Sequence, residues 1–182
     1  MPSDVLTIIR AAHFAAVKHA AQRRKGKAAE PYVNHVLEVA HLVAEAGLDA
    51  DVIAAALLHD TVEDTETSPA ELEAEFGPVI SNLVLELTDD KSLLKADRKR
   101  LQVERAPHKS VGAQAIKTAD KISNLRSILA SPPADWDEQR KQEYFAFAHA
   151  VVAGLAQAPE SLRAEFAAVH HRLTGIVQRK NV

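Results

Sequence analysis

Four ionisable side chains directly follow an apolar run and could together bind a cation: His59, Asp60, Glu63 and Asp64. The run from Val52 to Leu58 predicts a helix at the centre of a bundle, so the polar residues at its end should be buried. If that helix continues, residues four apart share a face, which brings Glu63 near His59 and Asp64 near Asp60. Buried carboxylates are costly unless a cation or hydrogen bonds compensate them. These residues alone leave two interpretations open, a metal site and a solvated helix end.

Two further segments offer side chains that could complete a metal site. His35 opens a second predicted helix, and Asp120 lies in a later helix with Asn124 one turn away on the same face. Taken singly, each has a structural interpretation: His35 as a hydrogen-bonded core residue, and Asp120 as half of an exposed ion pair with Lys121. A metal site therefore requires a fold that brings these separate segments together.

The charged residues are segregated along the chain, although the net charge is only −3. Residues 28–90 contain 15 acidic residues and neither Lys nor Arg. Basic clusters flank this block, namely Lys18, Arg23, Arg24, Lys25 and Lys27 before it and Lys91, Lys95, Arg98, Lys99, Arg100, Arg105 and Lys109 after it. An acidic segment that binds a divalent cation, with flanking bases that bind phosphate, suits a metal-assisted reaction on an anionic substrate. Solvated helix faces are the alternative explanation.

Length and composition predict one globular domain over residues 1–182, with 47% hydrophobic residues for its core. The chain has no cysteine, which excludes disulfides, thiolate metal sites and thiol nucleophiles. No stretch approaches the roughly 20 apolar residues that span a bilayer, and the N-terminus has no secretory signal. We therefore expect a cytoplasmic protein with no membrane contact, and at this net charge no nucleic-acid partner. The sequence leaves its oligomeric state open.

The spacing of apolar residues and the weakness of strand signals predict an all-α bundle of about eight helices. The first should be capped by Ser3 and end near Arg24. Ser68 and Pro69 predict the start of a helix after a sharp turn, and Pro78 predicts another. The expected ranges are 3–24, 31–47, 51–64, from 68, 78–88, 93–106, 110–129, 137–156 and 160–180.

The order of these residues resembles that of the HD-domain phosphohydrolases, whose metal is held by a first His, a His-Asp doublet and a distant Asp. The local sequence is similar to the hydrolase domain of RelA/SpoT homologues over residues 24–126. The matching motifs are Arg24-Lys25, Pro31-Tyr32 with His35, Leu57-Leu58-His59-Asp60 with Glu63-Asp64-Thr65, Phe76-Gly77, and Lys117 with Asp120-Lys121 and Asn124-Leu125-Arg126. Glu143-Tyr144-Phe145 and Val151-Val152 with Gly154-Leu155 extend the resemblance to the stand-alone small alarmone hydrolases of the Mesh type.

This resemblance implies metal ligands and catalytic acids. The ligands would be His35, His59, Asp60 and Asp120, and the usual ion of the family is Mn²⁺. Two imidazoles and two carboxylates also suit Zn²⁺ or Fe²⁺, so the donor set does not decide among the three ions. Glu63 and Asp64 would be the catalytic residues, because they could orient the attacking water and exchange protons with it.

The resemblance also implies the substrate, guanosine 3′,5′-bis(diphosphate) (ppGpp), which would be hydrolysed at the ribose 3′ position to GDP and pyrophosphate. Arg24 would stack on the guanine, which suits a planar guanidinium. Lys25 and Asn124 would contact the nucleotide, and Tyr144 and Lys95 are candidates for contacts to the base and the 5′-diphosphate. Two alternatives remain: a phosphatase that acts on another nucleotide such as NADPH, and a degenerate nucleotide-binding HD module.

Overall fold

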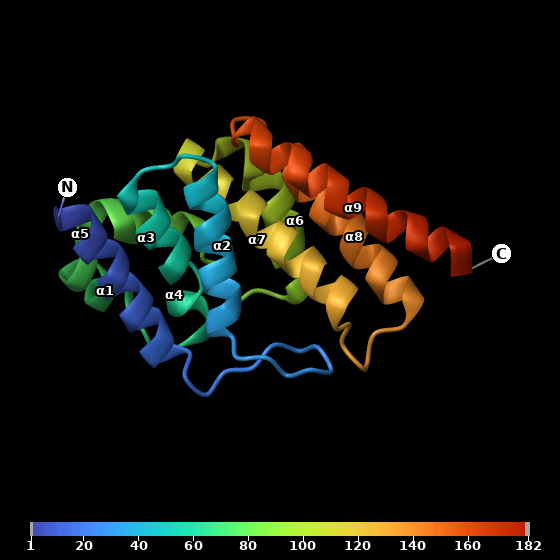
Figure 1. Cartoon of the computed structure of the whole chain (residues 1–182), viewed down its shortest axis with the longest axis horizontal. Coiled ribbons are helices and arrows are strands. Elements are labelled where there is room, and N and C mark those ends of the chain that lie inside the picture. The colour runs from blue at the N-terminus through green and yellow to red at the C-terminus, as the bar shows by residue number, and fades with distance from the viewer. Residues whose placement is uncertain (1, 181–182) are drawn as a thin grey trace.

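The computed structural model describes the backbone of residues 2–180 and the side chains of residues 3–175, and in this range the protein is all-α. Figure 1 shows α7 in the middle of the bundle, with α1, α2 and α3 on one side and α8 and α9 on the other. The elements are α1 (Pro2–Lys18), α2 (Val33–Glu45), α3 (Ala50–Leu58), α4 (Thr61–Asp64), α5 (Pro69–Leu87), α6 (Lys95–Arg105), the 3-10 helix η1 (Ala106–His108), α7 (Val111–Ala130), α8 (Glu138–Ala153) and α9 (Glu160–Lys180).

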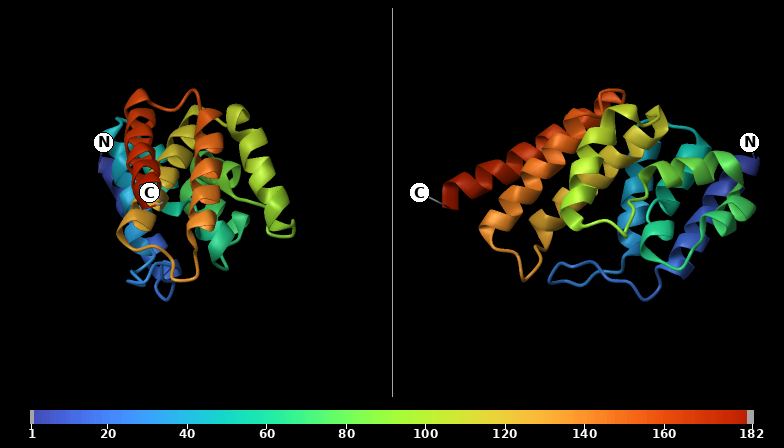
Figure 2. Two further views of the ribbon diagram at one scale, coloured as in Figure 1. Left: turned by 90° about the vertical axis from the view of Figure 1, so that its right-hand side faces the viewer. Right: turned by 180° about the vertical axis from the view of Figure 1, so that it is seen from behind.

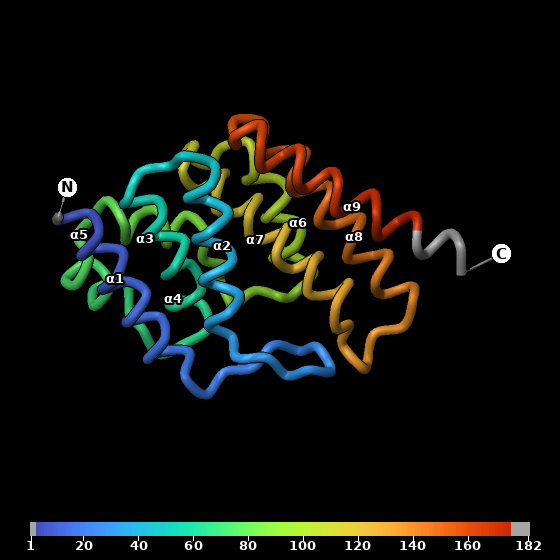
Figure 3. The backbone as a smooth tube through the Cα atoms, viewed as in Figure 1, coloured from blue at the N-terminus to red at the C-terminus, as the bar shows by residue number. Residues whose placement is uncertain are grey.

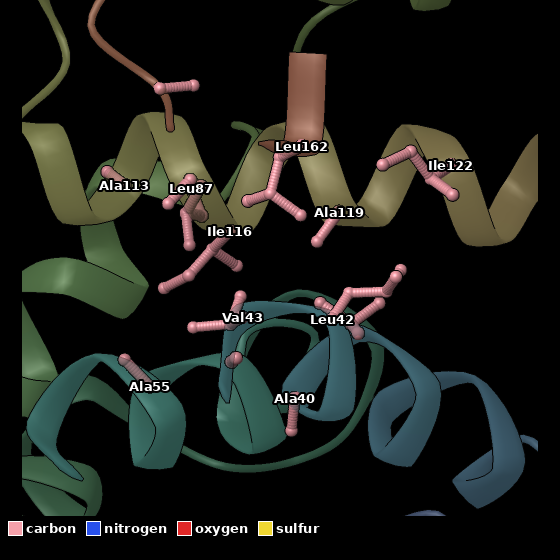
Figure 4. Packing of buried hydrophobic residues seen from close by; sticks show 14 of the residues in the cluster. Ala40, Leu42, Val43, Ala55, Leu87, Ala113, Ile116, Ala119, Ile122 and Leu162 are labelled. Carbon is pink, nitrogen blue, oxygen red and sulfur yellow. The ribbon is translucent and has the colours of Figure 1, made fainter. Parts of the chain in front are cut away.

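Helix α7 has buried side chains on several faces, as expected for a helix at the centre of a bundle. Figure 4 shows Ile116 and Ala119 of α7 pointing toward Val43 and Leu42 of α2, and all four residues belong to the buried core. Burying one large aliphatic side chain contributes roughly 1.5–3 kcal/mol to stability. The same helix also buries Asp120, so the core that stabilises the fold also holds a charged side chain in place.

The first helix differs from the sequence prediction at both ends. The predicted helix is capped by Ser3 and ends near Arg24, but α1 spans Pro2–Lys18, so Ser3 lies inside it. The residues after α1 form a hairpin, in which the Arg24 amide donates to the Glu30 carbonyl at 2.9 Å. The helical pattern beyond Lys18 is therefore overridden by a different set of backbone hydrogen bonds.

A contact with a distant loop explains why this hairpin replaces the end of the helix. Gly26, near the hairpin tip, forms an isolated bridge with Pro133, and the Ala28 amide donates to the Ser131 hydroxyl at 2.9 Å. A Cβ atom at Gly26 would lie 2.2 Å from the Ser131 carbonyl oxygen, so only glycine fits there. Figure 3 shows the two loops approaching each other along one edge of the bundle. The hairpin thus holds its basic residues next to the loop between α7 and α8.

The single helix predicted over 51–64 is divided into two. Helix α3 ends at Leu58, His59–Asp60 form a turn, and α4 begins at Thr61. The Thr61 hydroxyl donates to the Leu58 carbonyl at 2.7 Å, and His59 Nδ1 lies 2.8 Å from the Ala56 carbonyl. Such side-chain bonds compete with the regular helical ladder. The turn that results projects both members of the His-Asp doublet into one site.

The break predicted before Pro78 is confirmed, as is the helix start at Ser68. The Ser68 hydroxyl accepts a hydrogen bond from the Glu71 amide at 3.1 Å. Helix α5 (Pro69–Leu87) contains a kink at Gly77, whose φ of 79° and ψ of 169° lie outside the helical region. Proline cannot continue a regular hydrogen-bond ladder, so the residue before it takes the bend. The remaining boundaries agree with the prediction within three residues.

No helix among the described residues has the length and apolarity needed to cross a membrane.

Candidate metal centre

Three distant segments bring four of the predicted residues together. His35 lies in the first turn of α2, His59 and Asp60 in the turn after α3, and Asp120 in α7. His35 Nε2 lies 3.4 Å from Asp120 Oδ1 and 3.6 Å from Asp60 Oδ2. His59 Nε2 lies 3.1 Å from Asp60 Oδ2 and 3.9 Å from Asp120 Oδ1. Two imidazole nitrogens and two carboxylate oxygens therefore converge on one point, and we call this group the HD cluster.

Hydrogen bonds fix the tautomers of both histidines. His59 Nδ1 lies against the Ala56 carbonyl, which can only accept, so this nitrogen carries the proton. The Ser123 hydroxyl donates to Glu38 Oε2 at 2.6 Å, so it can only accept from His35 Nδ1, which lies 2.8 Å away. In both neutral imidazoles the lone pair is therefore on Nε2.

The HD cluster fits a divalent cation. The Nε2 atoms of His35 and His59 are buried and have no hydrogen-bond partner among the described residues. In the neutral imidazoles the Nε2 lone pairs face carboxylate oxygens that are also acceptors, so either a proton or a bound cation is needed to make these short approaches favourable. One donor atom from each of His35, His59 and Asp120 can lie within 4.8 Å of the others. Mixed nitrogen and oxygen donors suit Mn²⁺, Fe²⁺ and Zn²⁺.

The electrostatics of the HD cluster also favour positive charge. Burial alone lowers the pKa of His59, but the negative charge of Asp60, whose Oδ2 lies 3.1 Å from Nε2, outweighs it together with that of Asp120 and raises the pKa to about 8. Burial alone raises the pKa of Asp60, but His59 and His35 hold it well below its usual range. Lys121 has the same effect on the buried Asp120. Both carboxylates therefore stay ionised at neutral pH.

Neighbouring side chains orient the two carboxylates. The Tyr32 hydroxyl donates to Asp60 Oδ2 at 2.5 Å, and burial together with the charge of Asp60 raises the pKa of Tyr32 far above its ordinary value. Asn124 Nδ2 donates to Asp120 Oδ1 at 2.6 Å, while Lys121 Nζ lies 3.2 Å from Asp120 Oδ2. Such outer hydrogen bonds fix the direction in which a ligand presents its oxygen.

A hydrogen-bonded chain behind His35 is a feature that the sequence analysis missed. It runs from His35 through Ser123 to Glu38, whose other oxygen accepts from Arg126 at 2.9 Å. Arg126 also donates to Glu165 of α9 at 2.8 Å. Glu38 lies one turn after His35 on α2, and this spacing is the signal that could have suggested a shared role.

The two candidate catalytic acids lie beside the loop that follows α5. The Asp89 amide donates to Glu63 Oε2 at 3.0 Å, and burial raises the pKa of Glu63 above its ordinary value. Asp64 accepts from Lys91 Nζ at 2.6 Å and from Gln22 Nε2 at 3.2 Å. The hydrogen bonds of both acids thus go to other segments instead of to the histidine and aspartate one turn earlier.

Four of the five predicted substrate-binding residues line one cavity of about 280 Å³ next to the HD cluster. Arg24 Nη2 donates to Asn124 Oδ1 at 2.7 Å, so the hairpin is connected to the residue that orients Asp120. Trp136, which the sequence analysis did not select, also lines this cavity and lies 5.5 Å from the Tyr144 ring, centroid to centroid. The predicted residues in this nucleoside cavity, as we call it, are Arg24, Lys25, Asn124 and Tyr144.

The fifth predicted substrate residue, Lys95, lines an adjoining cavity of about 480 Å³. The two cavities share Lys25, Trp136 and Tyr144. Neighbouring cations lower the pKa of Lys95 in addition to burial, which has the larger effect. The adjoining cavity is therefore an electropositive extension of the nucleoside cavity.

Comparison with known proteins assigns the chain to a family. The HD-domain family model matches residues 11–157. The guanosine-3′,5′-bis(diphosphate) 3′-pyrophosphohydrolases MESH1 of Xenopus tropicalis and Homo sapiens are each 52% identical to the chain over 157 residues, which are 85% of this chain and 88% of theirs. The GTP pyrophosphokinase rsh of Brucella ovis is 38% identical over 121 residues, but these are only 16% of its length.

Solved structures agree with this assignment. A metazoan orthologue of SpoT, described as hydrolysing ppGpp, superimposes with a TM-score of 0.88 at 42% identity, over 91% of this chain and 94% of that one. The protein lmo0812 from Listeria monocytogenes superimposes with a TM-score of 0.67 at 30% identity, over 79% and 96%. The chain therefore belongs to the HD-domain family, together with the MESH1 pyrophosphohydrolases.

Proposed function

We propose that this protein is a metal-dependent ppGpp 3′-pyrophosphohydrolase, which converts ppGpp and water to GDP and pyrophosphate. The observation that carries the proposal is the HD cluster, in which two buried imidazole Nε2 atoms without a hydrogen-bond partner face two ionised carboxylates. The MESH1 relatives, which cover most of the chain at 52% identity, carry this activity in their names. The substrate would be a free nucleotide in the cytoplasm.

His35, His59, Asp60 and Asp120 would hold the cation, which we take to be Mn²⁺, with Zn²⁺ or Fe²⁺ as alternatives. When bound, such a cation supplies a Lewis acid that lowers the pKa of water and polarises a phosphate ester. The hydrogen bonds at both Nδ1 atoms support this role, because they leave Nε2 of each neutral imidazole to bind a metal.

Glu63 would take the proton of the attacking water. Burial raises the pKa of Glu63, which makes it a better base than an exposed carboxylate, and the Asp89 amide holds one of its oxygens in place. Asp64 would orient the same water from a position fixed by Lys91 and Gln22. The proton that the ribose 3′ oxygen needs when it leaves would return from this pair of acids.

The nucleoside cavity would hold the guanosine part of the substrate. Arg24 presents a planar guanidinium for stacking on the base, and its bond to Asn124 ties that position to the HD cluster. Lys25 and Tyr144 line both this cavity and the adjoining one, where Lys95 would bind the 5′-diphosphate. In this arrangement the ribose 3′ ester would lie near Asp60 and Asp120.

We also propose that residues 1–182 act as one hydrolase domain. The support is that α9 packs on α7 and α8. Its residues Phe166, Val169 and Leu173 belong to the same buried core as α2 and α3. No domain that binds nucleic acid is needed for the proposed reaction.

The test is release of GDP and pyrophosphate from ppGpp by metal-stripped protein, before and after addition of Mn²⁺, with NADPH assayed in parallel. We expect pyrophosphate release only after Mn²⁺ is added, and none from the same preparation of an Asp120→Asn variant. Phosphate released from NADPH without any turnover of ppGpp would contradict the proposal and support the nucleotide phosphatase instead.

A further inference from the structure

A second cavity, of about 300 Å³, lies on the other side of the HD cluster and has no role in the proposed function so far. It is enclosed by the end of α5, the loop that follows it, α6 and the first half of α7. The right view of Figure 2 shows this face, with α6 toward the viewer. We call it the α6 cavity.

Basic side chains of α6 and α7 line the α6 cavity. Arg98, Gln102 and Arg105 follow one another at spacings of four and three residues, so they share one face of α6. Arg98 Nε is buried and has no hydrogen-bond partner among the described residues. Because an arginine nitrogen can only donate, it requires an acceptor. Lys117 of α7 also lines the cavity, although only 8% of its surface is exposed.

The carboxylates of the α6 cavity are already hydrogen-bonded to neighbouring groups. Arg98 and Arg105 form no ion pair with any described carboxylate, although hydrogen bonds from Ser92 together with the charge of Arg105 lower the pKa of Asp90. Asp89 accepts from Gln102 at 2.5 Å, Asp90 accepts from Ser92 at 2.6 Å, and Glu86 accepts from the Ser110 amide at 2.9 Å. The guanidinium groups therefore remain available for an anion.

The α6 cavity borders the HD cluster directly. Lys117 Nζ lies 4.0 Å from Asp120 Oδ2, and the Asp89 amide is bonded to Glu63. On the opposite side of the same aspartate, Oδ1 accepts from Asn124 of the nucleoside cavity. The HD cluster thus lies between the nucleoside cavity and the α6 cavity, in which Arg98 and Arg105 form no ion pair with a described carboxylate.

We propose that the α6 cavity binds the outer phosphate of the substrate's 3′-pyrophosphate group and then the pyrophosphate product. This inference rests on the proposed function. The water oxygen bonds to the phosphorus that carries the ribose 3′ oxygen, and the bond between that phosphorus and the 3′ oxygen breaks. Its electron pair stays on the 3′ oxygen, which takes up a proton, while a proton of the water goes to Glu63. The pyrophosphate that is released carries the water oxygen and lies where Arg98 and Arg105 donate.

The test is a calorimetric titration of inorganic pyrophosphate into metal-stripped protein. The metal is left out because pyrophosphate chelates Mn²⁺, which would interfere with the measurement. Arg98→Gln and Arg105→Gln should each weaken binding by about tenfold, the loss expected for one charge-assisted bond. Arg105 is exposed, so Arg105→Gln should leave the fold intact. It therefore keeps the test valid even where Arg98→Gln disturbs the fold. The matched control is Arg100→Gln, because Arg100 pairs with Glu104 at 2.8 Å and does not line the cavity.

Product inhibition of ppGpp hydrolysis, at a fixed concentration of free Mn²⁺, gives a second readout. The inhibition constant for pyrophosphate should rise by the same factor in both variants, whereas that for GDP should stay unchanged. Equal pyrophosphate constants in the wild type and both variants would overturn the inference. Absence of ppGpp turnover together with arginine-dependent pyrophosphate binding would overturn the proposed function but leave the pyrophosphate site standing.

Discussion

At the scale of single residues, His59 couples metal binding to pH. Its pKa in the metal-free protein is about 8, above the ordinary 6.5, so at pH 7 the imidazole is mostly protonated. A cation must displace that proton, so binding at pH 7 should release about one proton, and affinity should increase as pH rises toward 8. Calorimetry of Mn²⁺ binding in two buffers of different ionisation enthalpy measures the number released.

Above the pKa of His59 the same measurement should change. At pH 9 the imidazole of the metal-free protein is already neutral, so proton release should fall toward zero and the affinity should no longer depend on pH. Equal proton release at pH 7 and pH 9 would contradict the pKa of His59 or its role as a ligand.

Glu63 is the residue whose substitution separates catalysis from metal binding. Glu63→Gln should leave the dissociation constant of Mn²⁺ unchanged and lower kcat by about 10²–10⁴, the usual effect of losing a general base. Because burial raises the pKa of Glu63, the wild-type kcat at saturating Mn²⁺ should fall with decreasing pH through a pKa above 4.5, and this limb should be absent in the variant. The control is Glu66→Gln, an exposed acid nearby. Full activity of Glu63→Gln would refute the assignment.

Residues with a local pattern could be predicted from the sequence, and residues without one could not. The His59-Asp60 doublet follows an apolar run, and His35 follows a recognisable Pro-Tyr pair, so both stand out in the sequence. Ser123 and Glu38 are 85 positions apart and meet only because α2 packs on α7. The spacing of Glu38 after His35 is visible in the sequence, but no spacing rule links either residue to Ser123 on the other helix.

At the scale of elements, the contact between α2 and α7 should set the affinity for metal. Ser123→Ala removes the acceptor that fixes the His35 tautomer and separates the imidazole from Glu38. Loss of such a partner typically costs 10–100-fold in metal affinity, and we expect a loss of that size. The matched control is Ser127→Ala, one turn farther along α7. Equal Mn²⁺ dissociation constants for the two variants would show that the chain behind His35 has no role in orienting it.

The kink in α5 depends on one glycine. Gly77 has a φ of 79° and a ψ of 169°, a region that only glycine adopts readily. Nothing lies within 4 Å of a Cβ added there, so the cost of substitution is conformational and not steric. Gly77→Ala should lower the free energy of unfolding by about 1–3 kcal/mol, measured by urea denaturation. Asn, which tolerates the left-handed helical region, should not restore stability, because this ψ lies outside that region.

Local rules predict the break in α5 but not the end of α1. Pro78 constrains the residue before it whatever the rest of the chain does, so the bend at Gly77 can be read from two adjacent positions. Helix α1 ends at Lys18 because the hairpin that follows contacts Pro133, more than 100 residues later. Helix propensity continues past Lys18, and a tertiary contact overrides it.

At the scale of the whole molecule, the HD cluster connects elements that are distant in sequence. Its residues come from α2, the turn after α3, and α7, so a cation bound there holds three core elements together. A ligand that binds only the folded state stabilises it by about 2.7 kcal/mol at 100 times its dissociation constant. For a chain of this size, that free energy corresponds to a rise in Tm of roughly 5–11 °C. Thermal unfolding of metal-stripped protein with and without Mn²⁺ measures this rise.

Asp120→Asn tests whether this stabilisation comes from the HD cluster. The amide keeps the shape of the side chain but removes the charge that lies between Lys117 and Lys121, both buried against it. The variant should lose the Mn²⁺-dependent rise in Tm, because the remaining donors cannot balance a divalent cation beside two ammonium groups. An unchanged rise in Tm with stoichiometric Mn²⁺ would place the metal elsewhere. The charge of Asp120 would then serve only to stabilise the two lysines within the core.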